Sequence, residues 1–219
     1  MFKAIAIKEL REVAPLAAAA LIVSAYCVVL LTGLNVLTFE PYRVTAIPFL
    51  DRSVFVTFVI VLGTSLAIAL GLRQSAWESG TGTYLFLLHR PASRYWLMGA
   101  KLITGLLVLL ATTAAPILAY ALWAATPGNL PAPFRWSMTG TVWLLWFAMT
   151  IVYLGAFLSG LRPARWYATR LLPLVGIAPV MPIIFLLQSK WMIGVAITIL
   201  LDAILLAAIY RIAETREYS

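Results

Sequence analysis

The chain has 219 residues, of which 63% are hydrophobic and 11% are charged, and its net charge is +8. A soluble domain has about 45–50% apolar and about 25% charged residues, so this composition excludes an ordinary soluble fold. The positive charge does not indicate a nucleic-acid-binding protein, because the basic residues are spread over several connections and accompany no nucleic-acid-binding motif.

The first dozen residues predict a helix that lies along the membrane surface. Apolar residues recur at largely helical spacing over residues 2–12, while Lys8 and Arg11 occupy the rest of the circumference and Glu9 interrupts the apolar face. Such an interfacial helix can precede a first span, and Pro15 is a suitable place for the chain to turn into the membrane. A plain charged flank before the first span is the alternative.

Long apolar segments with few or no charged residues follow along the chain. A helix needs about 20 apolar residues to cross the hydrocarbon core, and six segments have about that length or more. The fifth contains Pro173, Pro179 and Pro182, so we expect it to be kinked or partly re-entrant. The expected spans are residues 14–37, 54–72, 97–125, 140–161, 171–187 and 191–210.

The distribution of Lys and Arg predicts the orientation of these spans. Basic residues near span ends favour the cytoplasmic side, and the connections on the side of the N-terminus hold most of the 16 in the chain. We therefore expect a multi-pass protein of the cell (plasma) membrane with both termini in the cytoplasm. The inner cations would be Lys3, Lys8, Arg11, Arg73, Arg90, Arg94, Lys101, Arg162, Arg165, Arg170, Arg211 and Arg216.

The inner connection over residues 73–96 is more polar than the spans around it. It holds Glu78, then a Ser/Gly/Thr cluster, then an amphiphilic run bounded by Gly82 and Pro91, which predicts a short helix under the membrane. Helices of this kind can dock into a partner. The residues that define the pattern are Glu78, Gly82, Thr83, Leu87, Pro91, Ser93 and Arg94.

This pattern resembles the first cytoplasmic loop of ABC-2 type transporter permeases, in which a coupling helix contacts the ATPase subunit. The N-terminal residues around Lys8, Glu9 and Arg11 are similar to the interfacial elbow helix of that family. The chain departs from the family at Gly80, where many members have a second Glu. The connection over 188–190 is also shorter than the outer hairpin that many members have there.

The resemblance implies a single all-α domain over residues 1–219, with six transmembrane helices, an interfacial helix and a cytoplasmic coupling helix. It implies a permease subunit, an exporter, that works as a homodimer or with another permease chain. The chain has no GxxxxGK[ST] phosphate-binding loop, so we expect ATP and magnesium on a separate ATPase subunit and neither a cofactor nor an enzyme activity on this chain.

Other functions stay open, among them an intramembrane enzyme and a membrane anchor or sensor without transport activity. Asp202 stands within the last span, where a carboxylate marks either a translocation or dimer-interface residue or a hydrogen-bonded packing contact. Ser159 has no base within a span to activate it. His89 is the single histidine and Cys27 the single cysteine, so neither can complete a metal set of its kind.

Overall fold

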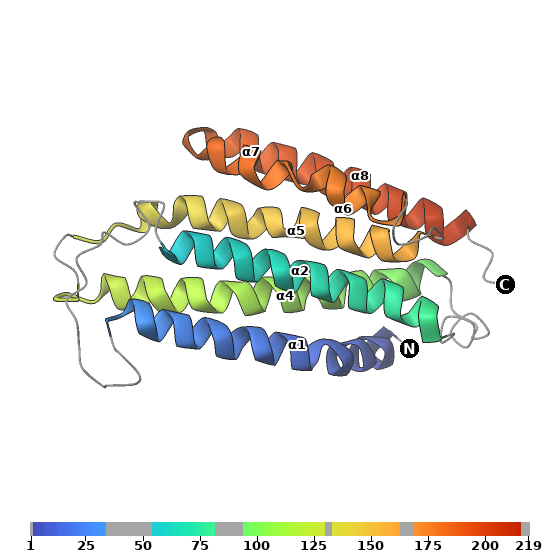
Figure 1. Ribbon diagram of the computed structural model, residues 1–219, viewed down its shortest axis with the longest axis horizontal. Helices are drawn as coiled ribbons and strands as arrows, with labels where there is room; N and C mark the ends of the chain where they lie inside the picture. Colours follow the sequence, from blue (N-terminus) through green and yellow to red (C-terminus); the bar gives the residue numbers. More distant parts are fainter. Residues whose placement is uncertain (1, 34–53, 82–93, 130–132, 163–168, 216–219) are drawn as a thin grey trace.

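The computed structural model describes residues 2–33, 54–81, 94–129, 133–162 and 169–215, and every regular element within them is a helix. The described helices form an elongated antiparallel bundle (Figure 1). Their bounds are α1 Phe2–Leu31, α2 Val54–Thr81, α4 Arg94–Ala125, η1 Trp136–Thr139, α5 Gly140–Leu161, α6 Leu172–Ile177, α7 Val180–Leu186, η3 Gln188–Lys190 and α8 Trp191–Thr215.

Five of the described helices are long and apolar enough to cross a membrane. This confirms an all-α architecture of the multi-pass membrane type. In each of them the backbone groups pair within the helix, as an apolar surrounding demands. These segments are Ile5–Leu31, Val54–Trp77, Tyr95–Ala125, Trp136–Leu161 and Trp191–Thr215.

The expected fifth span at 171–187 is a broken helix instead of a full-length one. Its apolar part, Leu172–Leu186, divides into α6 and α7, with Pro179 as the residue before α7. Fifteen residues of helix extend for about 22 Å at 1.5 Å per residue, which is less than the hydrocarbon core of about 30 Å. Six spans of full length are therefore not present among the described residues.

The pair α6 and α7 nevertheless runs back along α5, so that α8 returns to the end of the bundle where the chain begins (Figure 1). Both termini consequently lie at the same end. The last turn of α2 and the first turn of α4 are at that end as well.

The N-terminal helix and the inner connection differ from the expectation in extent. Pro15 does not separate an interfacial helix from a span, because α1 continues through it. Proline removes one backbone donor, and helices in membranes tolerate this when neighbouring groups compensate. The connection expected over 73–96 is helical at both ends, since α2 extends to Thr81 and α4 begins at Arg94.

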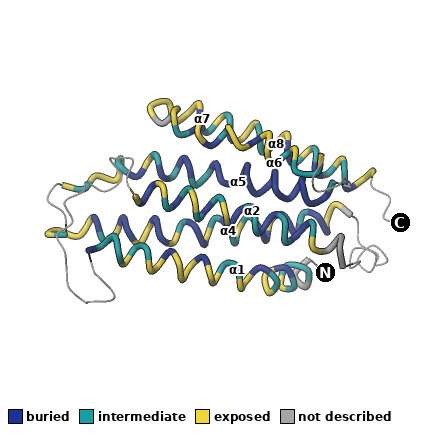
Figure 2. The backbone as a smooth tube through the Cα atoms, viewed as in Figure 1, coloured by how far each residue is buried: buried dark blue, intermediate teal, exposed yellow. Residues whose placement is uncertain are grey.

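The centre of the bundle is α5. Of its apolar span 78% is buried, against 22% for α8, and Figure 2 shows α5 dark over most of its length. Glycines on α2 permit the close approach of α2 and α5: a Cβ at Gly71 would lie 2.7 Å from the Tyr153 carbonyl oxygen, and one at Gly63 would overlap Met149. The small residues of α2 thus serve an intrachain contact.

Candidate functional site

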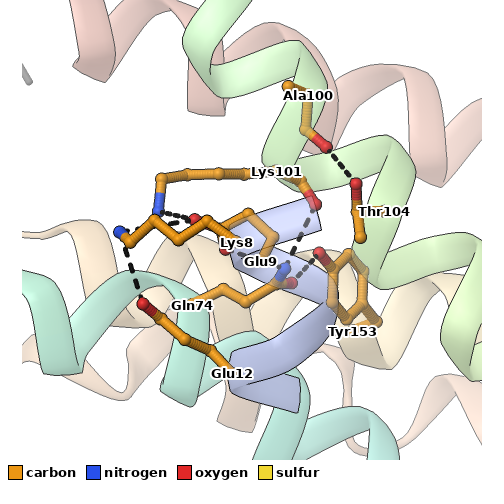
Figure 3. Close-up of polar contacts among 8 residues, drawn as sticks. All are labelled: Lys8, Glu9, Glu12, Gln74, Ala100, Lys101, Thr104 and Tyr153. Atoms are coloured by element: carbon orange, nitrogen blue, oxygen red, sulfur yellow. Dashed lines mark hydrogen bonds and ion pairs between the residues drawn. The ribbon is translucent and has the colours of Figure 1, made fainter. Parts of the chain in front are cut away.

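Four polar side chains from four different helices meet inside the bundle, near the end that holds both termini (Figure 3). They are Glu9 on α1, Gln74 on α2, Lys101 on α4 and Tyr153 on α5, and we call them the buried polar cluster. The exposed fraction is 1% or less for each of them. Charged side chains are seldom buried to this degree unless they are paired.

An ion pair forms the centre of the cluster. Lys101 Nζ lies 2.8 Å from Glu9 Oε1, which is the distance of a charge-assisted hydrogen bond. In the low dielectric of a helix bundle each charge loses its hydration, so the pair is tolerated only when further hydrogen bonds satisfy the remaining atoms.

Gln74 supplies those hydrogen bonds. Its amide nitrogen donates to Glu9 Oε2 at 3.2 Å and to the Lys101 carbonyl oxygen at 3.3 Å. Its amide oxygen accepts a hydrogen bond of 2.6 Å from the Tyr153 hydroxyl. Both Glu9 oxygens therefore have a partner, and one glutamine connects α1, α4 and α5.

The backbone positions explain why these side chains meet. Glu9 and the fully buried Val13 are four residues apart on α1, so both face the bundle. On α4, Gly105 leaves the space in which Gln74 meets Tyr153, because a Cβ at Gly105 would overlap Gln74 Oε1 and the Tyr153 hydroxyl. The buried polar cluster thus depends on glycine at position 105 as well as on its four polar side chains.

The cluster reaches the surface through Lys8. Lys8 Nζ lies 3.4 Å from Glu12 Oε1 and 3.9 Å from Glu9 Oε1, and the Lys8 side chain is 40% exposed. Exposed pairs of this kind contribute about 0–1 kcal/mol, far less than a buried one can. The polar contacts therefore run from a fully buried ion pair to the surface of α1.

The predicted site residues fall into three groups. Lys8 and Arg11 of the expected interfacial helix are exposed or partly exposed, whereas Glu9 is buried. Glu78 and Arg94 lie in the helices on either side of the connection. The remaining residues of the coupling pattern lie outside the described residues; they are Gly82, Thr83, Leu87, Pro91 and Ser93.

Lys101 requires a correction. The charge pattern placed it among the cations of an inner connection, but its side chain is fully buried in α4. Gln74 and Tyr153 were not predicted as site residues. The one signal for the cluster in the sequence is Glu9, which interrupts the apolar face of the first helix and so requires a buried partner.

Asp202 has a smaller set of contacts. The Thr150 hydroxyl of α5 lies 2.6 Å from Asp202 Oδ2 and 2.8 Å from the Phe147 carbonyl oxygen, although a hydroxyl carries one hydrogen. Asp202 Oδ1 is buried without a hydrogen-bond partner in the part of the chain that the structure describes. Asp202 thus joins α8 to α5 through one carboxylate oxygen, while its other oxygen makes no hydrogen bond to the described residues.

Ser159 has a structural role. Its hydroxyl accepts a hydrogen bond of 3.2 Å from the Leu174 backbone N–H, and the Arg170 guanidinium donates to the Ser159 and Gly160 carbonyl oxygens at 3.3 and 2.8 Å. These bonds join the end of α5 to the start of α6. Among the described residues, no three His, Cys, Asp or Glu side chains gather as a metal site would need.

Comparisons with protein families, with curated proteins and with solved structures found no match for this chain.

Proposed function

We propose that this chain is the permease subunit of an ATP-driven ABC transporter, an exporter, and that a separate ATPase chain binds the end of the bundle that holds both termini. The coupling pattern between Glu78 and Arg94 supports the proposal through its resemblance to ABC-2 permeases. The observation that carries it is the Glu9–Lys101 ion pair, which joins α1 to the helix that follows that pattern.

The buried polar cluster gives a physical route for such coupling. Gln74 and Lys101 each stand about two helical turns from the ends of α2 and α4 that adjoin residues 82–93. A partner that displaces this connection displaces both helices. The hydrogen bonds of Gln74 carry the displacement to Glu9 on α1 and to Tyr153 on α5.

The same proposal fixes the orientation and the assembly. The end with the termini is cytoplasmic in the cell membrane, as the positive-inside rule predicts. In this view α6 and α7 together form a sixth, broken crossing. Two permease chains, identical or different, form the pathway, and the partner subunits bind ATP and magnesium.

Affinity purification of the tagged full chain from membranes of its host tests the proposal. We expect a phosphate-loop ATPase to copurify and the complex to hydrolyse ATP. The double variant Glu78→Ala/Arg94→Ala should reduce the recovered ATPase by roughly tenfold or more, because interface charges each contribute on the order of a few kcal/mol. Mass spectrometry and ATP hydrolysis provide the two measurements.

Arg135→Ala is the matched control, because Arg135 is an exposed cation at the opposite end of the bundle. This variant should recover as much ATPase as the wild type does. Purification of the chain without any ATPase, or full recovery of the ATPase by the double variant, would contradict the proposal.

A further inference from the structure

A groove of about 560 Å³ opens between α5 and α8 at the end of the bundle away from the termini. Trp143, Leu144 and Phe147 of α5 and Trp191 and Val195 of α8 provide its apolar lining. Its volume falls within the range of roughly 300–1,000 Å³ that is common for ligand pockets.

The groove exists because α5 and α8 separate toward this end. Figure 1 shows the two helices farther apart toward the start of α8 than toward its end. They still touch at Gly194, where a Cβ would lie 3.1 Å from the Leu144 side chain. Leu144 is 5% exposed and forms the floor, whereas Trp191 is 58% exposed and stands at the rim.

The position of the groove determines which molecules can reach it. Both walls belong to helices long and apolar enough to span the membrane, so acyl chains of the leaflet at that end are the apolar molecules nearest to the groove. Ser137 and Thr141 add hydroxyl groups to the lining near the start of α5. Tryptophan at the rim suits the depth of the lipid headgroups.

Two cations stand within two residues of the groove lining in the sequence. Lys190 directly precedes Trp191, and Arg135 stands two residues before Ser137; both side chains are exposed. The lining itself contains no acidic residue. Asp202 lies about three helical turns farther along α8 from Trp191. The charges next to the lining residues therefore complement an anion.

We propose that this groove is a binding site for an anionic phospholipid, which inserts one acyl chain between α5 and α8 and places its phosphate between Arg135 and Lys190. The lining accepts the chain, and the two cations select the headgroup. Each Lys or Arg near an anionic headgroup contributes about a fivefold gain in binding. The site is independent of the ATPase and of the cargo.

Native mass spectrometry of the purified full chain with added phosphatidylglycerol or phosphatidylcholine tests the site. The wild type should bind one phosphatidylglycerol and prefer it over phosphatidylcholine. Gly140 lines the groove, and a Cβ there meets nothing within 4 Å, so Gly140→Leu adds an apolar side chain at the lining where its first carbon has room. Binding should fall roughly tenfold or more, because each CH₂ kept out of an apolar site loses about a factor of four.

Gly176→Leu is the matched control. A Cβ at Gly176 also meets nothing within 4 Å, and Gly176 lies in α6, away from the groove lining. This variant should bind phosphatidylglycerol as the wild type does. Equal binding by Gly140→Leu and the wild type, or equal loss in both glycine variants, would overturn the proposal.

The surface variants Arg135→Gln and Lys190→Gln test the headgroup contact without a change to the packing. Each should weaken phosphatidylglycerol binding about fivefold and leave phosphatidylcholine binding unchanged. Arg211→Gln, an exposed cation at the opposite end, should change neither. Equal binding of both lipids to the wild type, or a Gly140→Leu effect on oligomeric state alone, would overturn an anionic lipid as the occupant.

Discussion

Two carboxylates in the described helices, Glu9 and Asp202, have different surroundings. Glu9 is 1% exposed, and its two oxygens bind Lys101 and Gln74. Asp202 is partly exposed, and only its Oδ2 has a partner, the Thr150 hydroxyl. The first carboxylate belongs to a network over four helices, whereas the second joins two.

This difference indicates different roles. A fully satisfied ion pair fixes the relative positions of the helices that supply it, because any movement leaves a charge buried without a partner. A buried oxygen without a partner raises the free energy of the folded chain. The neighbourhood of Asp202 therefore favours a further polar group near Oδ1. Glu9 offers no such opportunity.

The largest expected effect comes from the removal of one charge of the ion pair. Lys101→Met leaves Glu9 buried beside Gln74 alone, with Lys8 3.9 Å away at the surface. Breaking a buried pair in this way costs about 3–5 kcal/mol. Equilibrium unfolding in mixed micelles of mild and denaturing detergent should show this loss in the free energy of unfolding.

Two control variants distinguish the contribution of the buried ion pair from that of nearby charges. The double variant Glu9→Gln/Lys101→Met removes both charges and should recover most of the lost stability. Lys8→Met removes an exposed cation and should cost less than about 1 kcal/mol. If Lys101→Met were as mild as Lys8→Met, the ion pair would not hold the helices together.

A smaller effect is expected from an added methyl group beside the cluster. Gly105→Ala places a Cβ on Gln74 Oε1 and the Tyr153 hydroxyl, so the hydrogen bond between them must move. Overpacking of this kind costs about 1–3 kcal/mol. The measurement is again the free energy of unfolding in mixed micelles.

Gly99→Ala is the control on the same helix. A Cβ at Gly99 would lie 3.5 Å from the Tyr210 hydroxyl, which is an ordinary contact. The change should be neutral or stabilise the helix by about 0.5–1 kcal/mol, since alanine is a better helix former. Equal losses of stability in Gly105→Ala and Gly99→Ala would mean that the lack of a side chain at Gly105 is not required for the buried polar cluster.

The sequence predicted the long helices well because apolar length is a local property. The spans expected over 54–72, 97–125, 140–161 and 191–210 each fall within one observed helix. Ends were less accurate: α2 continues to Thr81, since Gln74 and Ser75 are polar but buried against neighbouring helices. The prolines predicted a distorted fifth span, and the structure gives two short helices.

Burial could not be predicted from apolarity. The span in α5 has a mean hydropathy of 1.9 and is 78% buried, whereas the span in α8 has 2.6 and is 22% buried. Lipid and protein interior favour the same side chains, so the pattern cannot distinguish a central helix from a peripheral one.

The buried polar cluster could not be predicted from the sequence, for a related reason. Lys101 and Glu9 are 92 residues apart, and Tyr153 and Gln74 are 79 apart. Such pairs exist only once the helices have packed. A lysine near the predicted start of a span can serve equally as a surface anchor or as a buried partner.

The smallest expected effect concerns Asp202 and Thr150. Thr150→Val keeps the shape of the side chain and removes the hydroxyl, and hydrogen bonds between membrane helices contribute about 0.6 kcal/mol on average. We expect a loss of that order in the free energy of unfolding. A loss above about 2 kcal/mol would contradict the expectation that the Asp202–Thr150 contact contributes much less to stability than the Glu9–Lys101 ion pair.

Asp202→Asn shows which group donates in this contact. One hydroxyl hydrogen cannot serve both Asp202 and the Phe147 carbonyl oxygen fully, but a side chain that donates to Thr150 leaves that hydrogen for Phe147. The asparagine amide can donate in this way, so Asp202→Asn should lower the free energy of unfolding by less than Thr150→Val does. Thr150→Val should lower it in the Asp202→Asn background by as much as in the wild type. If Thr150→Val cost nothing in that background, the contact would depend on the charge of Asp202.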